Sequence, residues 1–417
     1  MDKAALAAEA ARILRANDRG GYTIPSAKLY PHQWNWDSAF AAIGWAILDP
    51  RRAARELAML ARGQWDDGMI PHIVFNPAAE HYQPGPAAWR TIGAPGAPKD
   101  VRTSSITQPP IAATAARIVL ERAGGDRDVE ATLRALVPAL DRWHAWFLRT
   151  RDPTGEGVVA IVHPWESGMD NATRWDRALS RIDPGHVEYQ RVDDQIVDAR
   201  ERPTKREYDR YFFLVEERAR RQFAPPRLDE PFLIADVAMT AILARAEADL
   251  ALLADALGES IGDRADHWRA GLAALGTHDR DLVTGETIDV DHVSSLVAAA
   301  ESIASRGSAA ARSTPAGSAE LIDARWHAPW PLPTVPLNDP LYEPRRYWRG
   351  PTWININWLV ITGLRDAGKT DRAAELANRT IELVAESGFR EYYHPESGEG
   401  LGAEEFTWTA ALVLDLL

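Results

Sequence analysis

The stretch "DEPFLIADVAMTAILARAEADLALLADALG", Asp229 to Gly258, indicates the class of the fold. Its apolar residues recur at intervals of three and four, which is the period of an α-helix. Asp229 can cap the start of a helix, Pro231 suits its first turn, and Gly258 can end it in the left-handed conformation. The stretch therefore predicts one long helix over residues 229–258.

The same helical period recurs along the rest of the chain. A second clear helix starts at Thr370, a suitable cap, and ends at Gly388. Further helices are expected at about residues 3–16, 38–61, 108–123, 128–149, 260–275, 292–305, 352–367 and 406–417. Strand-like alternation is scarce and no interdomain linker is recognisable. The sequence therefore predicts an all-α fold in which residues 1–417 form a single domain.

Two long segments interrupt the helical pattern, residues 151–228 and 310–350. Both are rich in Pro, Arg, Tyr and Trp, in a chain that has 16 tryptophans. Long loops in a compact domain are usually functional or disordered, and high aromatic content argues against disorder. We therefore expect a helical scaffold whose aromatic loops gather at one end.

Composition excludes several classes of protein. The 417 residues carry a net charge of −13, which argues against a nucleic-acid partner. The absence of cysteine excludes disulfides, thiolate catalysis and cysteine-ligated zinc. No run approaches the roughly 20 apolar residues of a membrane span, and the N-terminus lacks the apolar core of a secretory signal. We expect a cytoplasmic protein with no membrane partner; the oligomeric state is left open, a homo-oligomer included.

Two further patterns point to a phosphate or a metal site, and both are set aside. "GLRDAGKT", Gly363 to Thr370, matches the phosphate-binding loop G-x-x-x-x-G-K-[ST], but that motif needs a preceding strand, and the sequence here favours a helix-turn-helix. The acid pairs Asp66-Asp67 and Asp193-Asp194 lack a metal-ligand spacing and are interpreted as solvated loop acids. No metal and no cofactor are expected.

Several clusters interleave aromatic residues with Asp, Asn, Gln and His near predicted helix starts. A sugar offers C–H faces that stack on aromatic rings and hydroxyls that hydrogen-bond to polar side chains, so such clusters are typical of carbohydrate sites. For any single Trp, core packing is the alternative. The candidate binding residues in these clusters are Tyr30, Trp34, Trp36, Asp37, His72, Gln108, Tyr347, Trp348 and Trp353.

The segment "HPWESGMDNATRWD", His163 to Asp176, places two carboxyl groups beside Trp165. Glycoside hydrolysis needs one protonated carboxyl to donate a proton and one ionised carboxyl to activate water. Asp170 is the candidate acid, because an apolar setting raises a carboxyl pKa, and Gly168 leaves room for a sugar. Glu166 is expected to hold the loop or to bind a sugar hydroxyl. The alternative for Asp170 is a helix N-cap, and spacing alone does not decide between the two roles.

The second carboxyl is expected near the C-terminus, in "HPESGEGLGAEEFTWTAALVLDLL". This glycine-rich segment holds Glu399, Glu404 and Glu405 and leads into the last predicted helix. Glycines before an acid allow a loop to close over a substrate. The alternative is a solvated turn whose glutamates cap the helix.

Taken together, "HPWESGMDN", "YPHQWNWDSAF" and "GLGAEEFTWTAAL" resemble glycoside hydrolase family sixty-three, in particular its short bacterial members, the mannosylglycerate and glucosylglycerate hydrolases. The likeness extends from Tyr30 to the last predicted helix. It implies an (α/α)6 barrel with the site at one mouth, and an inverting, metal-independent α-glycosidase. The implied substrate is a hexose joined to D-glycerate.

The resemblance also implies roles for individual residues. Asp170 matches the family's general acid. The last motif is similar to the trehalase signature, which puts Glu404 at the base position; Glu405 stands where that signature has Gly, so it is held in reserve. For the glycerate carboxylate, the loop "RPTKREYDRYFF" offers a cationic clamp, with Arg206 and Tyr211 as its first candidates.

Three alternative functions are also compatible with the sequence. The first is an α-glucosidase that acts on another small glucoside such as trehalose or kojibiose. The second is a sugar epimerase on the same barrel type, with His32, His72 or His163 transferring protons. The third is a sugar-binding protein without catalytic activity.

Overall fold

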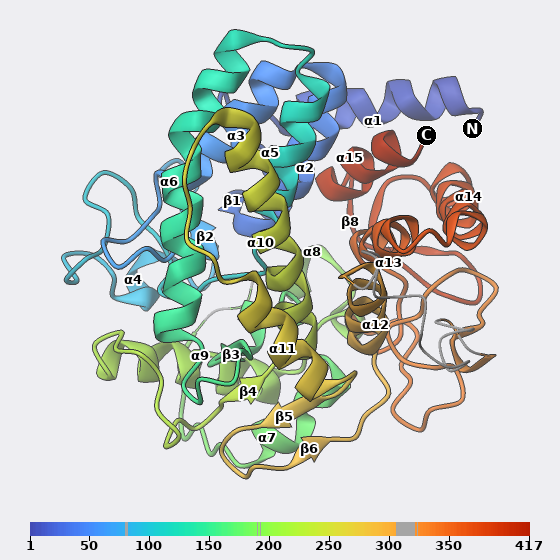
Figure 1. The fold of residues 1–417 in the computed structure, drawn as a ribbon. Helices are drawn as coiled ribbons and strands as arrows, with labels where there is room; N and C mark the ends of the chain where they lie inside the picture. The colour runs from blue at the N-terminus through green and yellow to red at the C-terminus, as the bar shows by residue number, and fades with distance from the viewer. Residues whose placement is uncertain (80–81, 190, 192, 306–321, 323) are drawn as a thin grey trace.

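The computed structural model describes residues 1–79, 82–189, 191, 193–305, 322 and 324–417, and its architecture is a barrel of paired helices (Figure 1). Among the described elements, α2, α5, α10, α12, α13 and α15 contact one another in a closed ring. The ring helices are α2 (Asn35–Leu48), α5 (Ala112–Arg122), α10 (Val237–Leu257), α12 (Ser294–Ser305), α13 (Ile354–Asp366) and α15 (Thr407–Leu416). The expected (α/α)6 barrel is confirmed.

An outer layer packs against this ring. Its helices are α1 (Lys3–Asn17), α3 (Pro50–Ala61), α6 (Arg127–Thr150), α11 (Ala265–Leu275) and α14 (Thr370–Ser387). Each contacts a ring helix: α1 packs on α15, α3 on α2, α6 on α5, α11 on α10 and α14 on α13. In Figure 1 the two chain ends lie close together, because α1 and α15 are neighbours.

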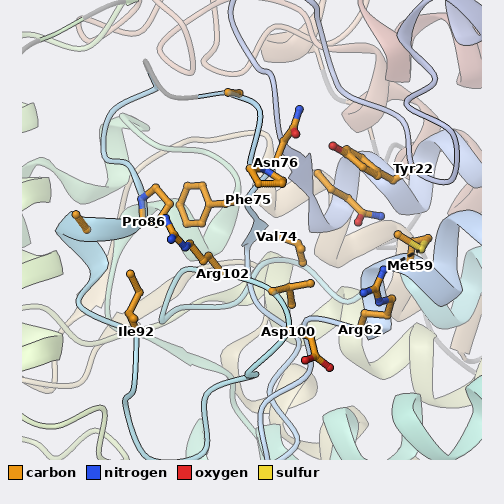
Figure 2. Close-up of a pocket in the computed structure, with 15 residues that line it drawn as sticks. Tyr22, Met59, Arg62, Val74, Phe75, Asn76, Pro86, Ile92, Asp100 and Arg102 are labelled. Atoms are coloured by element: carbon orange, nitrogen blue, oxygen red, sulfur yellow. Dashed lines mark hydrogen bonds between the residues drawn. The ribbon is translucent and has the colours of Figure 1, made fainter.

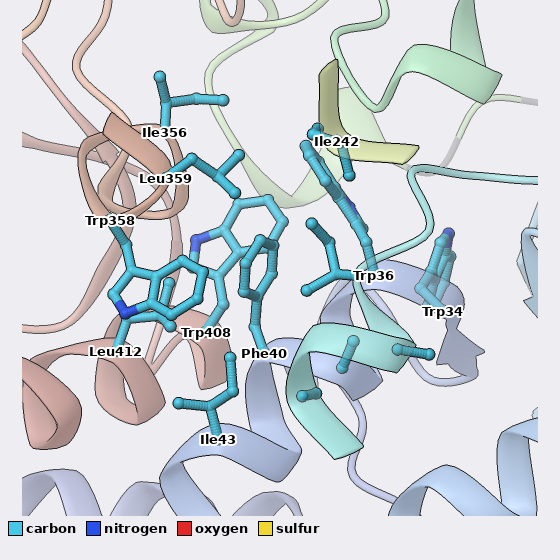
Figure 3. Packing of buried hydrophobic residues seen from close by; sticks show 14 of the residues in the cluster. Trp34, Trp36, Phe40, Ile43, Ile242, Ile356, Trp358, Leu359, Trp408 and Leu412 are labelled. Carbon is cyan, nitrogen blue, oxygen red and sulfur yellow. The ribbon is translucent and has the colours of Figure 1, made fainter. Parts of the chain in front are cut away.

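The burial of the two layers follows their sequences. Ring helices such as α2, α13 and α15 are buried at nearly every position, because they pack on both sides, and they are accordingly apolar all round. Outer helices such as α3 and α14 bury one face only. Figure 3 shows the core where Trp36, Phe40, Trp358 and Trp408 meet, with ring centroids of consecutive neighbours 5.4–6.4 Å apart.

Short strands lie before several ring helices. The pairs and sheets are antiparallel: β1 (Gln33–Trp34) with β2 (Ile73–Val74); β3 (Ala160–Ile161), β4 (Ile234–Ala235), β5 (Asp279–Asp281) and β6 (Thr287–Ile288) in that order; and β7 (Arg390–Tyr393) with β8 (Gly400–Glu404). Since β1, β4 and β8 directly precede α2, α10 and α15, these strands gather at the N-terminal ends of the ring helices.

The structure corrects three expected boundaries. The helix expected over residues 229–258 starts only at Val237, where Asp236 accepts a hydrogen bond from the Met239 N–H at 3.0 Å; residues before it form β4. The helix expected over residues 38–61 is two helices, because Asp49 caps a new helix that has Pro50 in its first turn. The helix starting at Thr370 has Lys369 as its N-cap residue, with no side-chain cap.

The two predicted loop segments differ. Residues 151–228 contain a helix that was not expected, α9 (Lys205–Arg220), which begins with a capping box formed by Thr204 and Glu207. They also contain the short elements η1 (Pro164–Ser167), η2 (Thr173–Trp175), α7 (Asp176–Ser180), α8 (Asp193–Ile196) and η3 (Ala199–Glu201). The second loop segment contains η5 (Ala324–Trp326), and α4 (Pro86–Trp89) precedes both segments. Of the second loop, residues 310–321 and 323 lie outside the described residues.

The segment from Gly363 to Thr370 spans the end of α13 and the start of α14. It is thus a helix-turn-helix, as expected, and not a phosphate loop. Among the described residues no helix is both long and apolar enough to cross a lipid bilayer.

Candidate active site

A narrow pocket opens where the segments preceding the ring helices converge. Its free volume is about 60 Å³, small because aromatic side chains close around it. The lining residues are Pro25, Tyr30, Trp34, Trp36, Asp37, His72, Gln108, Trp165, Gly168, Asp170, Arg202, Tyr347, Glu391, Phe406 and Trp408. Clusters from both halves of the sequence therefore meet in one place.

Most of the predicted binding residues line this pocket. They are Tyr30, Trp34, Trp36, Asp37, His72, Gln108, Trp165, Gly168 and Tyr347, together with the candidate acid Asp170. Trp348 and Trp353 do not line it. They stack on each other with centroids 3.8 Å apart and are buried behind the pocket wall, where Trp353 contacts the Tyr347 ring at 5.1 Å.

Gly168 makes room for an aromatic ring of the protein itself. Its φ is +72°, and a Cβ atom at this position would lie 2.5 Å from atoms of the Trp36 ring. The expectation that Gly168 leaves space for a sugar is thus refined: its missing side chain lets Trp36 form the pocket wall. Trp36 is further held by its backbone N–H, which donates to Gln108 Oε1 at 3.3 Å.

Asp170 presents its carboxyl group to the pocket from the loop after η1. Burial raises the pKa of this carboxyl to about 7, and the nearby Glu391 adds to the effect while Arg202 opposes it. The Tyr211 hydroxyl donates to the Asp170 backbone oxygen at 3.0 Å. The N-cap residue of the following helix, η2, is Ala172, so the capping alternative for Asp170 does not hold.

Glu166 holds the loop that carries Asp170. It is fully buried, and its carboxylate accepts hydrogen bonds from Arg151 Nη2 at 2.6 Å, the Val162 N–H at 2.8 Å and the Thr107 N–H at 3.2 Å. Of the two expected roles for Glu166, the structure shows the first. The residue is not among those lining the pocket.

The second carboxyl group in the pocket is Glu391 on β7, which the sequence reasoning missed. It is 1% exposed, accepts from the Tyr30 hydroxyl at 2.8 Å and from the Ala403 N–H at 2.9 Å, and lies 3.6 Å from Arg202 Nη1. Burial raises the pKa of Glu391, whereas Arg202 and these hydrogen bonds counteract the rise. A sequence signal existed, because "REYY" places an acid among aromatic residues of a strand.

The predicted base residue, Glu404, lies outside the pocket, and its expected location is corrected. Its side chain is 62% exposed and forms ion pairs with Arg390 at 2.7 Å and Lys28 at 3.8 Å. Glu405, held in reserve, is 57% exposed and pairs with Arg12. Side chains alternate along a strand, so Glu404 points away from the face on which Leu401 and Ala403 are buried.

Asp37 adds a third carboxyl group to the pocket. It lies in the first turn of α2 and is 4% exposed. Burial raises the pKa of Asp37 well above its usual range, and the charges of Glu391 and Asp170 raise it further. Like charges that share a buried site do not all ionise, so Asp37 is expected to hold its proton at neutral pH.

The cation of the pocket is Arg202 and not the predicted Arg206, which is exposed on the first turn of α9. The Arg202 guanidinium lies over the Tyr347 ring at 4.2 Å, and its Nε donates to Asp193 Oδ2 at 3.0 Å. Tyr211, the other predicted clamp residue, is fully buried and contacts the Trp165 ring with centroids 5.5 Å apart. It supports the pocket from behind.

A second small cavity adjoins the pocket and shares Tyr30 and Arg202 with it. Its other lining residues are Leu29, Tyr82, Gln83, Tyr189, Arg191, Asp193, Tyr208 and Phe212. Asp193 accepts from the Tyr208 hydroxyl at 3.0 Å as well as from arginines, and although burial opposes it, Arg202 and Arg191 lower the pKa of Asp193. The interpretation of Asp193 as a solvated loop acid is therefore wrong.

The three histidines considered for proton transfer lie in surroundings that favour their neutral form. Burial lowers the pKa of His32 to about 4 and that of His163 to about 3, and it holds the pKa of His72 well below its usual range. Of the three, only His72 lines the pocket. Its Nδ1 lies 3.3 Å from Ser104 Oγ, and its ring stacks on Trp165.

A larger cavity, about 750 Å³, has Gln33 of β1 and Val74 of β2 among its lining residues (Figure 2). Apolar residues such as Val74, Phe75 and Ile92 line it together with Arg62 and Arg102. Asp100 contributes the one carboxyl group among its described lining residues. Since no pair of carboxyl groups lines this cavity among the described residues, the smaller pocket is the catalytic candidate.

Comparison with known proteins identifies the family of the chain. Residues 30–409 match the family described as "Mannosylglycerate hydrolase MGH1-like glycoside hydrolase domain". The chain is 42% identical to the mannosylglycerate hydrolase of Thermus thermophilus, over 97% of this chain and 99% of that protein. It is 37% identical to the glucosylglycerate hydrolase of Mycolicibacterium hassiacum, over 99% of this chain and 97% of that protein.

A solved structure extends the likeness to the fold. The crystal structure of the GH63 mannosylglycerate hydrolase from Thermus thermophilus, in complex with Tris and D-glycerate, matches with a TM-score of 0.87 and 41% sequence identity, covering 98% of this chain and 99% of that chain. Since the family match spans most of the chain and the relatives match along nearly their full length, the protein belongs to the mannosylglycerate hydrolase MGH1-like glycoside hydrolases of family 63.

Proposed function

We propose that this glycoside hydrolase cleaves an α-glycoside of D-glycerate, mannosylglycerate or glucosylglycerate, with inversion at the anomeric carbon. The observation that carries the proposal is the presence of Asp170 and Glu391 in one aromatic pocket, in surroundings that suit opposite roles. The names of the relatives in Thermus thermophilus and Mycolicibacterium hassiacum support the substrate class.

Asp170 is the general acid. A general acid must carry its proton at the working pH, and a pKa of about 7 meets that need. It protonates the glycosidic oxygen as the bond to the glycerate hydroxyl breaks. Above that pKa the carboxyl loses its proton, so the activity falls on the alkaline side.

Glu391 is the general base. Burial raises the pKa of Glu391, but Arg202 and the hydrogen bonds from Ala403 and Tyr30 oppose that rise and so support the ionised form that a base needs. It removes a proton from the water that attacks the anomeric carbon from the face opposite the leaving oxygen. An inverting enzyme keeps its two carboxyl groups about 6.5–9.5 Å apart to leave room for that water.

The glycerate end is bound in the adjoining cavity. Nη1 of Arg202 is buried and makes no hydrogen bond within the described part of the chain, so it can receive the glycerate carboxylate. Tyr82 lines the same cavity and offers a hydroxyl donor. Arg202 thus replaces Arg206 as the clamp. A D-glycerate complex of the Thermus thermophilus relative supports a glycerate site in this family.

Proton NMR during turnover tests the proposal. We expect mannosylglycerate, glucosylglycerate or both to yield free hexose, with the β-anomer appearing first because the bond inverts. Trehalose and kojibiose serve as comparison substrates without a carboxylate and should react far more slowly. Turnover of trehalose at the rate of the glycerate glycosides would contradict the substrate class, and early release of the α-anomer would contradict inversion.

A further inference from the structure

We propose that Glu166 is a positioning residue, which acts on the reaction through Asp170 without touching the substrate. The proposal rests on the proposed acid role of Asp170. The segment from Pro164 to Asp170, here called the acid loop, then contains two essential carboxyl groups, and Glu166 has a function different from that of the proton donor Asp170.

Glu166 connects three segments of the pocket wall. It sits in η1, four residues before Asp170. Oε2 accepts from the Val162 N–H, just after β3, at 2.8 Å, and Oε1 accepts from the Thr107 N–H at 3.2 Å. Thr107 directly precedes Gln108, which lines the pocket. One carboxylate therefore sets the acid loop in register with a neighbouring binding segment.

The charge of Glu166 is as important as its hydrogen bonds. Arg151, at the end of α6, is 1% exposed and donates to Glu166 Oε1 at 2.6 Å, while its Nε and Nη1 make no hydrogen bond within the described residues. Removing one partner of a buried ion pair leaves the other charge uncompensated. A neutral amide at position 166 would also turn a donor toward Arg151 or the Val162 N–H. The loop is then expected to move away from its present position.

A displaced acid loop affects only a reaction that needs the acid. A glyceryl oxygen is a poor leaving group and requires a proton from Asp170 as the bond breaks. An α-hexosyl fluoride releases fluoride, which leaves with far less help from an acid. Both substrates still require the water activated by Glu391. The ratio of the two rates therefore reports the position of the acid separately from the rest of the site.

The test compares Glu166→Gln with wild type on the preferred glycerate glycoside and on the matching α-hexosyl fluoride. We expect kcat on the glycoside to fall about 100-fold, as for a misplacement of about 1 Å, with KM nearly unchanged. On the fluoride, kcat should fall far less, because fluoride leaves with little help from the displaced acid. Because both rates come from one preparation, the ratio does not depend on the folded fraction.

Matched variants separate positioning from general stability. Glu247 lies on α10, outside the lining of the pocket, and its buried carboxylate pairs with Arg264 at 2.8 Å. Glu247→Gln therefore removes another buried carboxylate that is paired with an arginine. It should lower the melting temperature without changing the ratio of the two rates. Arg151→Lys keeps the buried positive charge and should show a smaller selective loss of activity on the glycoside. If Glu166→Gln does not fold, Arg151→Lys replaces it in the comparison of the two substrates.

Asp170→Asn distinguishes failure of this inference from failure of the proposed function. If Asp170→Asn loses activity on the glycoside selectively but Glu166→Gln and Arg151→Lys lose both activities equally, the positioning role is wrong and the acid assignment stands. If Asp170→Asn keeps its activity on the glycoside, the acid assignment is wrong and the positioning role falls with it.

Discussion

Glu391 and Glu404 lie on the same hairpin, yet only one of them faces the pocket. Glu391 is on β7 and is 1% exposed, whereas Glu404 ends β8 with 62% of its side chain exposed. Arg390 and Glu404 are directly opposite each other on β7 and β8, and their side chains form an ion pair. Arg390 thus shares the outer face with Glu404, and the next residue, Glu391, points inward.

The charged groups around the two glutamates also differ. Glu391 is surrounded by Tyr30, Ala403 and the buried Arg202, whereas Glu404 pairs with partly exposed cations in contact with water. Burial makes the protonation of Glu391 dependent on a few neighbours, while solvent screens the charge of Glu404. A short distance along the chain therefore separates the buried pocket environment of Glu391 from the solvent-exposed environment of Glu404.

The largest expected effect is that of Glu391→Gln. It keeps the size of the side chain but removes the base, so kcat should fall about 1,000-fold, within the range of general-base catalysis, with KM little changed. Initial rates on the glycerate glycoside measure this. A loss below about 10-fold, less than general-base catalysis contributes, would show that Glu391 is not the base and would weaken the contrast with Glu404.

The next effect is that of Arg202→Met, which removes the cation beside Glu391. Truncating one partner of a buried charge pair costs about 2–5 kcal/mol, so kcat/KM should fall about 30-fold or more at neutral pH. Because Arg202 lowers the pKa of both Glu391 and Asp170, its removal raises both values. The base then becomes protonated at a higher pH, so both the acidic and the alkaline limb of the profile of kcat/KM against pH should shift to higher pH. An unchanged profile would contradict the coupling.

Gly402→Ala tests how closely the hairpin packs on Glu391. A Cβ atom at position 402 would lie 2.5 Å from Glu391 Oε2, and the φ of Gly402 is +65°. We expect kcat to fall about 10-fold as the carboxylate is displaced, a modest fraction of the effect of misplacing a catalytic group. The control is Gly285→Ala, at φ +77° with nothing within 4 Å, which carries the same backbone strain. Equal activity losses in both variants would assign the effect to strain alone.

The smallest effect is expected for Glu404→Gln. Exposed ion pairs contribute about 0–1 kcal/mol to stability, so the melting temperature should change little and kcat should stay within about 2-fold of wild type. Steady-state rates and a thermal melt of the same sample measure both. A large loss of kcat here, with Glu391→Gln active, would reverse the assignment of the base.

Much of the architecture was predictable from local patterns. The apolar period of three and four residues located most of the ring and outer helices, because a helix buried against a core must repeat its apolar face. The aromatic clusters around Trp36, Gln108 and Tyr347 were predicted as carbohydrate-binding, and the structure brings them together. Helix starts were less predictable: Asp229 and Asp236 are both good caps, and only the pairing of β4 decides between them.

The residues that were misplaced share a physical cause. Glu404, Arg206 and Trp348 have side chains of the right chemistry, and each stands next to or near a residue that reaches the site. Whether a side chain faces a pocket depends on strand pleating, helix rotation and the packing of neighbours, which chain spacing does not reveal. The alternation of Leu401 and Ala403 in β8 was the available signal that Glu404 points outward.

Periodicity and local composition, which are properties of short segments, predicted from the sequence alone a helical protein with loops of carbohydrate-binding type, and the resemblance to family sixty-three added the barrel and the candidate acid Asp170. Only the tertiary structure decided which glutamate and which arginine enter the pocket. Glu391 and Arg202 acquire their roles from burial beside each other and beside Asp170, and the electrostatic coupling of those groups exists only when distant segments fold together.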